Sequence, residues 1–405
     1  MSLSQLAREI KESATLALNE KARLLREKGE PVIHLGAGEP KSVVPIDAIL
    51  GAASKLTSAE IRYTPTEGIP RLIKAVIRYT EDNYHRKVGP ENVIIHAGAK
   101  QAIYNLMMTL LNPQDEVIIL SPYWVSYPEI VKMLYGVPVI VTPEDGRFEP
   151  RIQDIVDKVG RYTRAIIVNS PNNPSGAVYS ADLIRELIEF CEKKHIYIIM
   201  DDIYHKLVFD GARAVSAFDY AGDFSDDSPV VVVNGVSKAY AMTGFRIGWT
   251  VANRKVTRVM INVAAQNTSC PSVVQQAAAA AALEGVQSGV ETLRLTLQNN
   301  RDIMMNELGT FTGIRCIKPQ GTFYCLPDFR AYSNDSTALS KLLLERALVA
   351  TVPGVEFGME GHLRLSYCGT VKGIMEGIAR IKWALDPESP NEIYIGDRKL
   401  RRDWL

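Results

Sequence analysis

Residues Ala165–Tyr204 have the sequence AIIVNSPNNPSGAVYSADLIRELIEFCEKKHIYIIMDDIY, and the fold assignment depends on the pattern within it. A short apolar run (Ala165–Val168) is followed by a segment with helical spacing (Ala181–Lys194) and then by a second apolar run (Ile196–Met200). Two buried strands joined by a helix are typical of a parallel α/β sheet. Ligands of such sheets bind at the carboxyl ends of the strands, so we expect functional residues directly after each run.

The same alternation extends from about residue 90 to residue 255. Further apolar runs are Val93–His96, Glu116–Leu120, Val137–Val141, Val230–Val233 and Ile247–Val251, with helical spacing in Gln101–Leu111. Several runs are apolar on both faces, which indicates strands buried between two layers of helices. The sequence therefore predicts an α/β domain with a mostly parallel sheet.

The pattern changes after Leu297, where a smaller α+β unit is expected. Its predicted elements are the strands Ile314–Ile317, Thr322–Leu326 and His362–Cys368 and the helices Thr337–Leu348 and Lys372–Leu385. We expect four parts. They are an N-terminal arm that packs with the small domain (1–40), a large ligand-binding domain (41–290), a small C-terminal domain (291–385) and a charged, partly disordered surface extension (386–405).

Composition narrows the class of protein. The 405 residues suit two domains, and Lys plus Arg and Asp plus Glu number 46 each, so charge gives no reason to expect nucleic acid or an acidic membrane as partner. The five cysteines contain no C-x-x-C pair, and an odd number fits reduced thiols in a cytoplasmic protein. The N-terminus has no apolar segment typical of a signal peptide, and no apolar run is long enough to span a membrane.

The most specific local pattern is Gly235–Gly248, GVSKAYAMTGFRIG, which follows the apolar run Val230–Val233. A lysine directly beyond a buried strand lies near apolar walls, which lower its pKa and make the free amine available for imine formation. Ser237 and Arg246 are donors suited to a phosphate group. A lone Lys238 would be interpreted as a solvated loop residue, but its combination with these donors and Gly244 argues against that.

The run Ile196–Met200 ends in Asp201-Asp-Ile-Tyr204. A carboxylate there is suited to pair with a protonated pyridine nitrogen, and Tyr204 is suited to donate to a cofactor oxygen. The alternatives are a metal site with His205 or a helix cap. Because the sequence has no second cluster of ligands and only six histidines, no metal is expected.

Other strand ends carry weaker signals. Asn173 lies in the turn sequence after Ala165–Val168, and Trp124 follows Glu116–Leu120, where it either stacks on a planar ring or belongs to the core. Residues Gly98, Ala99 and Lys100 follow Val93–His96 at the start of a helix, where backbone N–H groups bind phosphate. The position of all these groups at successive strand ends favours one shared site.

Together these residues resemble the class I aminotransferases of pyridoxal phosphate (PLP) fold type I, over about Lys11 to Leu385, and Gly235–Gly248 fits the family's lysine-site pattern. The resemblance implies a large domain with a mostly parallel seven-stranded sheet between helices, plus a smaller α+β domain. It also implies pyridoxal 5'-phosphate as cofactor, bound to Lys238 as an internal aldimine. Lys238 would then move the proton between the substrate Cα and the cofactor.

The resemblance also assigns roles to the other residues. Asp201 would hold the pyridine nitrogen protonated, Asn173 and Tyr204 would bind the phenolic oxygen, and Trp124 would stack on the ring. The phosphate would be held by Gly98, Ala99, Lys100, Ser237 and Arg246. Arg364, in Arg364-Leu-Ser-Tyr367, would grip the substrate α-carboxylate, which the backbone of Gly38 would approach. Tyr63 would reach the phosphate of a neighbouring subunit, which implies a homodimer with active sites at the interface.

The substrate depends on fewer residues. Lys11–Thr15, KESAT, resembles a bacterial aspartate aminotransferase subgroup in which residues like Thr15 and Lys100 recognise the distal carboxylate and one like Lys11 is associated with prephenate. The alternative for these three residues is a solvated arm and a phosphate-loop lysine. We expect ping-pong transfer between L-aspartate, with prephenate or arogenate as a further substrate, and 2-oxoglutarate.

Other activities on this fold stay open, namely an aromatic- or alanine-type aminotransferase and a PLP-dependent C–S β-lyase. The sequence also departs from the family at two places: Asp202 stands where glutamate is usual, and Lys41-Ser42 stand where Asp-Phe is common. The first change lies beside Asp201, and the second alters a loop near the substrate entrance and so bears on the substrate rather than on the chemistry.

Overall fold

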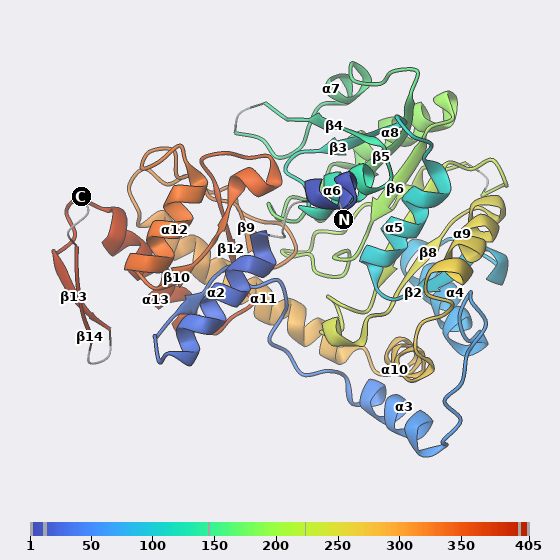
Figure 1. Cartoon of the computed structure of the whole chain (residues 1–405), viewed down its shortest axis with the longest axis horizontal. Coiled ribbons are helices and arrows are strands. Elements are labelled where there is room, and N and C mark those ends of the chain that lie inside the picture. Colours follow the sequence, from blue (N-terminus) through green and yellow to red (C-terminus); the bar gives the residue numbers. More distant parts are fainter. Residues whose placement is uncertain (1–2, 11–13, 145, 223, 396–397, 403–405) are drawn as a thin grey trace.

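A computed structural model of the chain describes residues 3–10, 14–144, 146–222, 224–395 and 398–402. Its main feature is a seven-stranded sheet with the order β2-β8-β7-β6-β5-β3-β4 (Figure 1). The strands are β2 (Val93–His96), β3 (Glu116–Leu120), β4 (Val137–Val141), β5 (Thr163–Val168), β6 (Tyr197–Asp201), β7 (Val230–Gly235) and β8 (Gly248–Val251). All seven apolar runs identified in the sequence form strands of this sheet.

The sheet is mostly parallel, as predicted. β3 pairs in parallel with β4 and β5, and β6 pairs in parallel with β5 and β7. β8 is antiparallel to both β2 and β7. The chain returns from β7 to β8 through residues 236–247, which contain no crossover helix, and only an antiparallel neighbour is reached by so short a connection.

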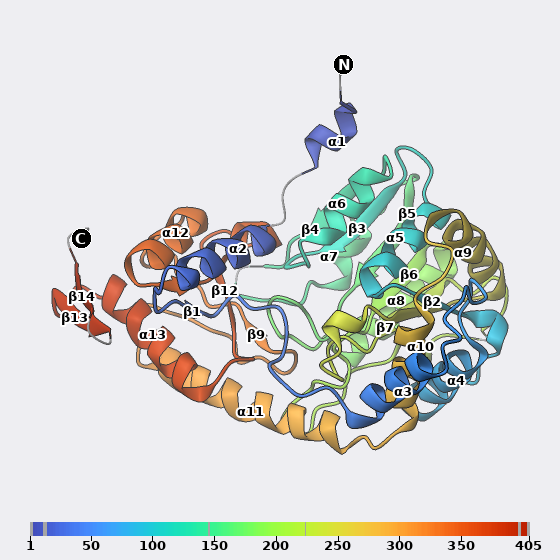
Figure 2. The same ribbon diagram turned by 60° about the horizontal axis from the view of Figure 1, so that its bottom comes forward.

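Helices cover both faces of this sheet (Figure 2). Along β6, Ile198 packs in a cluster with Leu72 of α4 (Pro70–Tyr84) and Leu187 of α8 (Ala181–Lys194). The next residue, Ile199, packs instead with Ile103 of α5 (Ala99–Leu110) and Met260 of α9 (Arg254–Asn267). Successive side chains of a strand point to opposite faces, which explains why the runs are apolar throughout. The helices of this part are α3 (Ile46–Thr57), α4 (Pro70–Tyr84), α5 (Ala99–Leu110), α6 (Ser126–Met133), α7 (Ile152–Val156), α8 (Ala181–Lys194), α9 (Arg254–Asn267) and α10 (Val273–Glu284).

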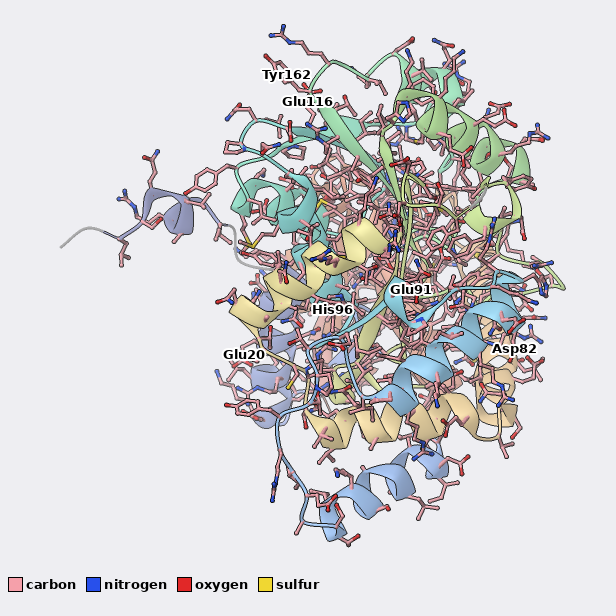
Figure 3. The ribbon with its side chains drawn as sticks, turned by 90° about the vertical axis from the view of Figure 1, so that its right-hand side faces the viewer. Glu20, Asp82, Glu91, His96, Glu116 and Tyr162 are labelled. Atoms are coloured by element: carbon pink, nitrogen blue, oxygen red, sulfur yellow. The ribbon has the colours of Figure 1, made fainter. Side chains whose placement is uncertain are left out.

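The parallel strands start at one edge of the sheet and end at the other. Glu116 begins β3, and its N–H donates to the carbonyl oxygen of Tyr162, just before β5, over 2.8 Å. Figure 3 shows these two residues close together, and they mark the amino edge of the sheet. The residues predicted to be functional follow the strands and therefore belong to the opposite edge.

A second core lies beside the large sheet. It contains a three-stranded antiparallel sheet, β11-β12-β9, and a parallel pair in which Ile33 of β1 faces Val349 of β10. The helix α11 runs from the large sheet toward this part (Figure 2). The elements are α1 (Gln5–Glu9), α2 (Ala14–Glu27), β1 (Ile33–His34), α11 (Ser288–Gly309), β9 (Tyr324–Cys325), α12 (Ser336–Arg346), β10 (Val349–Ala350), β11 (Val352–Pro353), β12 (Leu363–Ser366) and α13 (Val371–Leu385). The predicted domain boundaries at residues 40, 290 and 385 stay predictions.

Two predictions for this part need correction. Residues Ile314–Ile317 form no strand, since only Arg315 makes an isolated bridge, to Asp328, and Ile317 is 45% exposed. The side chains of Ile314–Ile317 bury too little surface for this segment to add a strand to the small sheet. The strand predicted at Thr322–Leu326 is reduced to the two residues of β9.

The C-terminal extension, expected to be only partly disordered, also contains secondary structure that was not predicted, at residues 392–395 and 398–401. These residues form an antiparallel hairpin of β13 (Glu392–Ile395) and β14 (Arg398–Arg401), which lies at the end of the molecule farthest from the large sheet (Figure 1). Ile393 and Leu400 pack against the second core, and Arg398 forms an ion pair with Glu30. Apolar packing and an ion pair therefore order an extension that looks only charged in the sequence. Among the described residues, no helix is both long enough and apolar enough to cross a membrane.

Candidate active site

A cavity of about 990 Å³ opens at the carboxyl edge of the large sheet and is lined both by residues of that sheet's end and by residues of the second core. It brings together eleven residues predicted from the sequence: Gly38, Ala99, Lys100, Trp124, Asn173, Asp201, Tyr204, Ser237, Lys238, Arg246 and Arg364. Gly98 lies beside Arg246. Tyr63 does not line the cavity and is 91% exposed. Lys11 and the side chain of Thr15 lie outside the described part of the chain.

Lys238 lies three residues beyond β7, and its side chain enters the cavity. Its Nζ donates a hydrogen bond to the carbonyl oxygen of Gly38 over 2.7 Å. Burial, together with the positive charge of Arg364, lowers the pKa of Lys238 to about 8. Desolvation disfavours the ammonium form, so a larger fraction of this amine is unprotonated at neutral pH than in an exposed lysine. This is the property required of an amine that attacks a carbonyl group or accepts a proton.

Asp201 is the last residue of β6 and is 4% exposed. The hydroxyl of Tyr127 donates to its Oδ2 over 2.6 Å, and the N–H of Ile203 donates to its Oδ1 over 3.4 Å. Burial raises the pKa of Asp201 to about 6, although the Tyr127 hydrogen bond and the charge of Lys238 oppose that shift. No arginine or lysine of the described chain forms an ion pair with Asp201. A buried carboxylate of this kind is suited to a cationic N–H group of a ligand.

The neighbouring Asp202 faces away from the cavity, as alternation along an extended segment requires. Burial raises the pKa of Asp202 to about 8, and its Oδ1 has no hydrogen-bond partner among the described residues. His205, the other member of the alternative metal site, places its Nε2 2.9 Å from the hydroxyl of Tyr79. The described residues include no group of three or more His, Cys, Asp or Glu side chains able to hold a metal ion.

The Asp202 environment leads to a pH prediction for the cofactor-free protein. An unfolded aspartate has a pKa of about 3.9, so the folded state binds more protons than the unfolded state between about pH 4 and the folded pKa of about 8. Stability then falls as pH rises through that window. We expect the melting temperature of the wild type to drop more between pH 5 and pH 8 than that of Asp202→Asn. Asp227→Asn, an exposed control, should keep the wild-type slope, and equal slopes for wild type and Asp202→Asn would contradict the prediction.

One end of the cavity is suited to a phosphate group. Gly98 has a φ of +91°, and a Cβ atom there would lie 2.5 Å from Nη2 of Arg246. Only glycine is therefore compatible with both the backbone conformation and the position of the arginine. Helix α5 begins at Ala99, and its first N–H groups have no partners within the helix. With Ser237 and Arg246 beside them, these groups form a set of donors for an anion.

Arg364 lies on β12 and is 2% exposed. Its Nη1 donates to Oδ1 of Asn173 and its Nη2 to the carbonyl oxygen of Gly36, each over 3.1 Å. Its guanidinium carbon lies 4.3 Å from the ring centroid of Tyr324. The Nε of Arg364 is buried without a hydrogen-bond partner in the described part of the molecule. The guanidinium of Arg364 is planar and fixed in orientation, and its Nε–H is free to donate. Such a group is suited to bind a carboxylate.

Lys100 and Trp124 form a second cationic position, on the large-sheet side of the cavity. Nζ of Lys100 lies 5.0 Å from the Trp124 ring centroid. Partial desolvation and the charge of Arg246 lower the pKa of Lys100. Lys100 and Arg364 therefore provide two separate positive charges around Lys238.

Three residues that shape the site were missed by the sequence analysis. Asn169 donates through Nδ2 to the carbonyl oxygen of Asp201 over 2.8 Å and accepts through Oδ1 from the N–H of Asn173 over 2.8 Å. Asn169 directly follows β5. The rule that ligands bind at the carboxyl ends of parallel strands could therefore have identified it from the sequence. Tyr127 and Tyr324 gave no such signal, because their contacts with Asp201 and Arg364 arise from tertiary packing.

Comparisons with known proteins agree with this geometry. The family model "Aminotransferase class I and II" matches residues 30–381. A probable aspartate/prephenate aminotransferase of Aquifex aeolicus is 38% identical, covering 93% of this chain and 97% of the relative, and an aspartate aminotransferase of Geobacillus stearothermophilus is 37% identical, covering 94% and 98%. The crystal structure of a Thermotoga maritima aspartate aminotransferase is 33% identical with a TM-score of 0.88, covering 94% of this chain and 99% of that one. The chain therefore belongs to the class I and II aminotransferase family.

Proposed function

We propose that this enzyme is a PLP-dependent aminotransferase that transfers the amino group between L-aspartate and 2-oxoglutarate by a ping-pong mechanism, with prephenate or arogenate as a further substrate. One observation carries the proposal. A lysine of lowered pKa, a buried carboxylate without a cationic partner and an arginine with a free donor all face one cavity. The names of the relatives, aspartate and aspartate/prephenate aminotransferases, support the substrate class.

The residues of the cavity fit pyridoxal 5'-phosphate. The α5 N-terminus with Gly98, Ala99 and Lys100, together with Ser237 and Arg246, would hold the phosphate. Asp201 would accept from the protonated ring nitrogen, Asn173 and Tyr204 would contact the phenolic oxygen, and Trp124 would stack on the ring. When bound, this cofactor supplies an electron sink that stabilises negative charge at the substrate Cα.

The protein's own residues then position the substrate and move protons. Arg364 binds the α-carboxylate, with its guanidinium fixed by Asn173 and Gly36. Lys238 would remove the proton from the Cα of the amino donor and, in the second half-reaction, give a proton to the Cα of the carbon skeleton that comes from the oxo acid, because its lowered pKa places the amine near the working pH. Tyr127 holds the Asp201 carboxylate in place through its hydroxyl.

The distal carboxylate of aspartate is assigned to Lys100, with Thr15, and prephenate recognition to Lys11. Support for Lys100 is its place on the cavity wall beside Trp124, separate from Arg364. An acid with two carboxylates is thereby held at both ends, which selects it over a neutral amino acid.

We further propose a cytoplasmic homodimer. Tyr63 is 91% exposed, and large apolar side chains before it are also exposed: Val43, Ile46, Ile49, Leu50, Leu56 and Ile61. So many large apolar side chains exposed within residues 43–61 favour a protein interface there. A second copy would bury these side chains and bring Tyr63 to the phosphate of the neighbouring active site.

The experiment is a cofactor and substrate analysis of purified protein. With PLP added, we expect an absorption band near ~400 nm from the cofactor. After borohydride reduction, peptide mapping should place the cofactor mass on Lys238. Stopped-flow spectra with aspartate, phenylalanine, alanine and cystathionine should show conversion to the amine form of the cofactor with aspartate. A protein that binds no PLP contradicts the cofactor assignment. Conversion by phenylalanine or alanine but not aspartate, or release of a thiol from cystathionine, contradicts the substrate assignment.

A further inference from the structure

The loop of residues 36–40 follows β1, and we call it the 36–40 loop. Residues 37–44 make no backbone–backbone hydrogen bond to any other described residue, so the position of the loop depends on side-chain contacts. The carbonyl oxygen of Gly36 accepts from Nη2 of Arg364 over 3.1 Å. The carbonyl oxygen of Gly38 accepts from Nζ of Lys238 over 2.7 Å. The loop therefore contacts two basic side chains that line the cavity.

Glu39 makes a third contact between this loop and the cavity wall. Its Oε2 accepts a hydrogen bond from the hydroxyl of Thr243 over 2.8 Å, and both residues line the cavity. Thr243 begins the short 3-10 helix η3 (Thr243–Phe245), which follows Lys238 in the chain. A hydrogen bond to a carboxylate is charge-assisted and therefore stronger than one between neutral groups. The Glu39–Thr243 contact thus joins the 36–40 loop to the segment that carries Lys238.

Thr243 also contacts the arginine at the phosphate end of the cavity. Nη1 of Arg246 donates to the backbone carbonyl oxygen of Thr243 over 2.8 Å. Arg246 in turn packs against Gly98, the last residue before α5. Thr243 therefore connects two ends of the site, the phosphate donors through its carbonyl group and the 36–40 loop through its hydroxyl.

Cofactor binding should make the Glu39–Thr243 hydrogen bond more important. A lysine ammonium has three N–H donors, and Lys238 directs one of them at Gly38. When the nitrogen of Lys238 is bonded to the cofactor, as the proposed function requires, it keeps at most one N–H donor. The attachment of the 36–40 loop then depends more on Glu39.

We propose that Thr243 and Glu39 form a positioning pair that holds the 36–40 loop, and with it Arg364, in the arrangement that binds the substrate α-carboxylate. This inference rests on the proposed aminotransferase function and adds two positioning residues to it. The pair acts through Gly36, whose carbonyl oxygen orients the guanidinium of Arg364. It also acts through Gly38, whose backbone would approach the same carboxylate.

The kinetic test removes either half of the pair. Thr243→Val deletes the hydroxyl but keeps the carbonyl group that accepts from Arg246, and Glu39→Ala deletes the carboxylate. For each variant we expect KM for both aspartate and alanine to rise about twofold to fivefold, the range for exposed charged contacts, with a smaller change in kcat. The double variant should be no worse than either single variant, because each change removes the same hydrogen bond.

Conservative variants separate positioning from a general loss of stability. Thr243→Ser keeps a hydroxyl donor and Glu39→Gln keeps a side-chain oxygen acceptor, so both should recover most of the wild-type KM. Thr296→Val is the matched control, because it removes an exposed threonine hydroxyl of α11 that does not line the cavity, and KM should stay unchanged. Wild-type KM values in Thr243→Val and Glu39→Ala, or additive losses in the double variant, would overturn the proposal.

Two measurements on the holoenzyme test the pair without turnover. Trypsin cleavage after Lys41, the exposed residue that follows the loop, should be faster in Thr243→Val than in wild type or Thr243→Ser. Succinate, which has no amino group to transfer, should bind more weakly to Thr243→Val in calorimetric titrations. Unchanged cleavage and unchanged affinity would refute the positioning pair. Faster cleavage and weaker binding in an enzyme that transaminates neither aspartate nor alanine would leave the pair standing and reject the proposed function.

Discussion

Replacing Lys238 with alanine is expected to lower kcat by about three orders of magnitude or more, since a positioned proton-transfer group alone contributes 10²–10⁴-fold. The amine lines the cavity and donates a hydrogen bond to the carbonyl oxygen of Gly38, and its pKa is lowered to about 8. The fold should survive, because the substitution shortens a half-buried side chain at a cavity wall. Turnover is measured at saturating PLP, and thermal melting reports the fold.

Two controls test whether the loss of activity is specific to the amine of Lys238. Methylamine or ethylamine added to Lys238→Ala should restore part of the activity, because a small amine can occupy the space left by the side chain. Lys206→Ala removes a lysine that does not line the cavity and whose Nζ lies 5.2 Å from the Tyr79 ring centroid, and this variant should retain most of the turnover. A Lys238→Ala enzyme with more than a tenth of wild-type kcat would be incompatible with the assigned role.

Arg364→Lys is expected to lower kcat/KM for every α-amino acid substrate by a similar factor, about 30-fold or more. Truncating one partner of a buried charge pair costs roughly 2–5 kcal/mol, and lysine cannot reproduce the planar fork of arginine. The loss should appear mainly in KM, because the α-carboxylate is bound in both the ground state and the transition state. Steady-state kinetics with aspartate and alanine measure it.

PLP binding by Arg364→Lys gives an independent test of the role assigned to this arginine. The guanidinium contacts Gly36, Tyr324 and Asn173 but none of the residues assigned to the phosphate, so PLP affinity should fall by much less than kcat/KM does. A loss confined to aspartate, with alanine unaffected, would instead place Arg364 at the distal carboxylate. A variant that no longer binds PLP would show that the arginine supports the fold of the site.

The large sheet was predictable because its strands carry their own signal. A residue pair such as Ile198 and Ile199 packs into two different cores, so a strand covered by helices on both faces has no polar side. The strand-end rule then located Lys238, Asp201 and Asn173 without any knowledge of contacts. The family resemblance extended the set to Arg364, which lies in a region of short strands where periodicity is weak.

The remaining features depend on tertiary contacts that no local pattern encodes. Tyr127 meets Asp201 across 74 positions of sequence, and its segment looks like an ordinary amphipathic helix. The hairpin strands at residues 392–395 and 398–401 were not predictable, because their apolar positions, Ile393 and Leu400, are few and their packing surface is formed by other elements. His34 belongs to no recognisable sequence motif. It lines the cavity because β1, which carries it, pairs with β10.

That pairing has a consequence for how the protein is made. Val349 lies 316 positions after Ile33 (349 − 33), so the partner of β1 leaves the ribosome about 15 to 60 s later, at synthesis rates of 5–20 residues per second. The seven strands of the large sheet, which end at Val251, are complete well before then. A nascent chain therefore contains every strand of the large sheet, together with Lys238 and Asp201, while the partner strand of β1 and His34 is still missing. The substrate-facing side of the cavity is finished last, when the C-terminal quarter of the chain arrives.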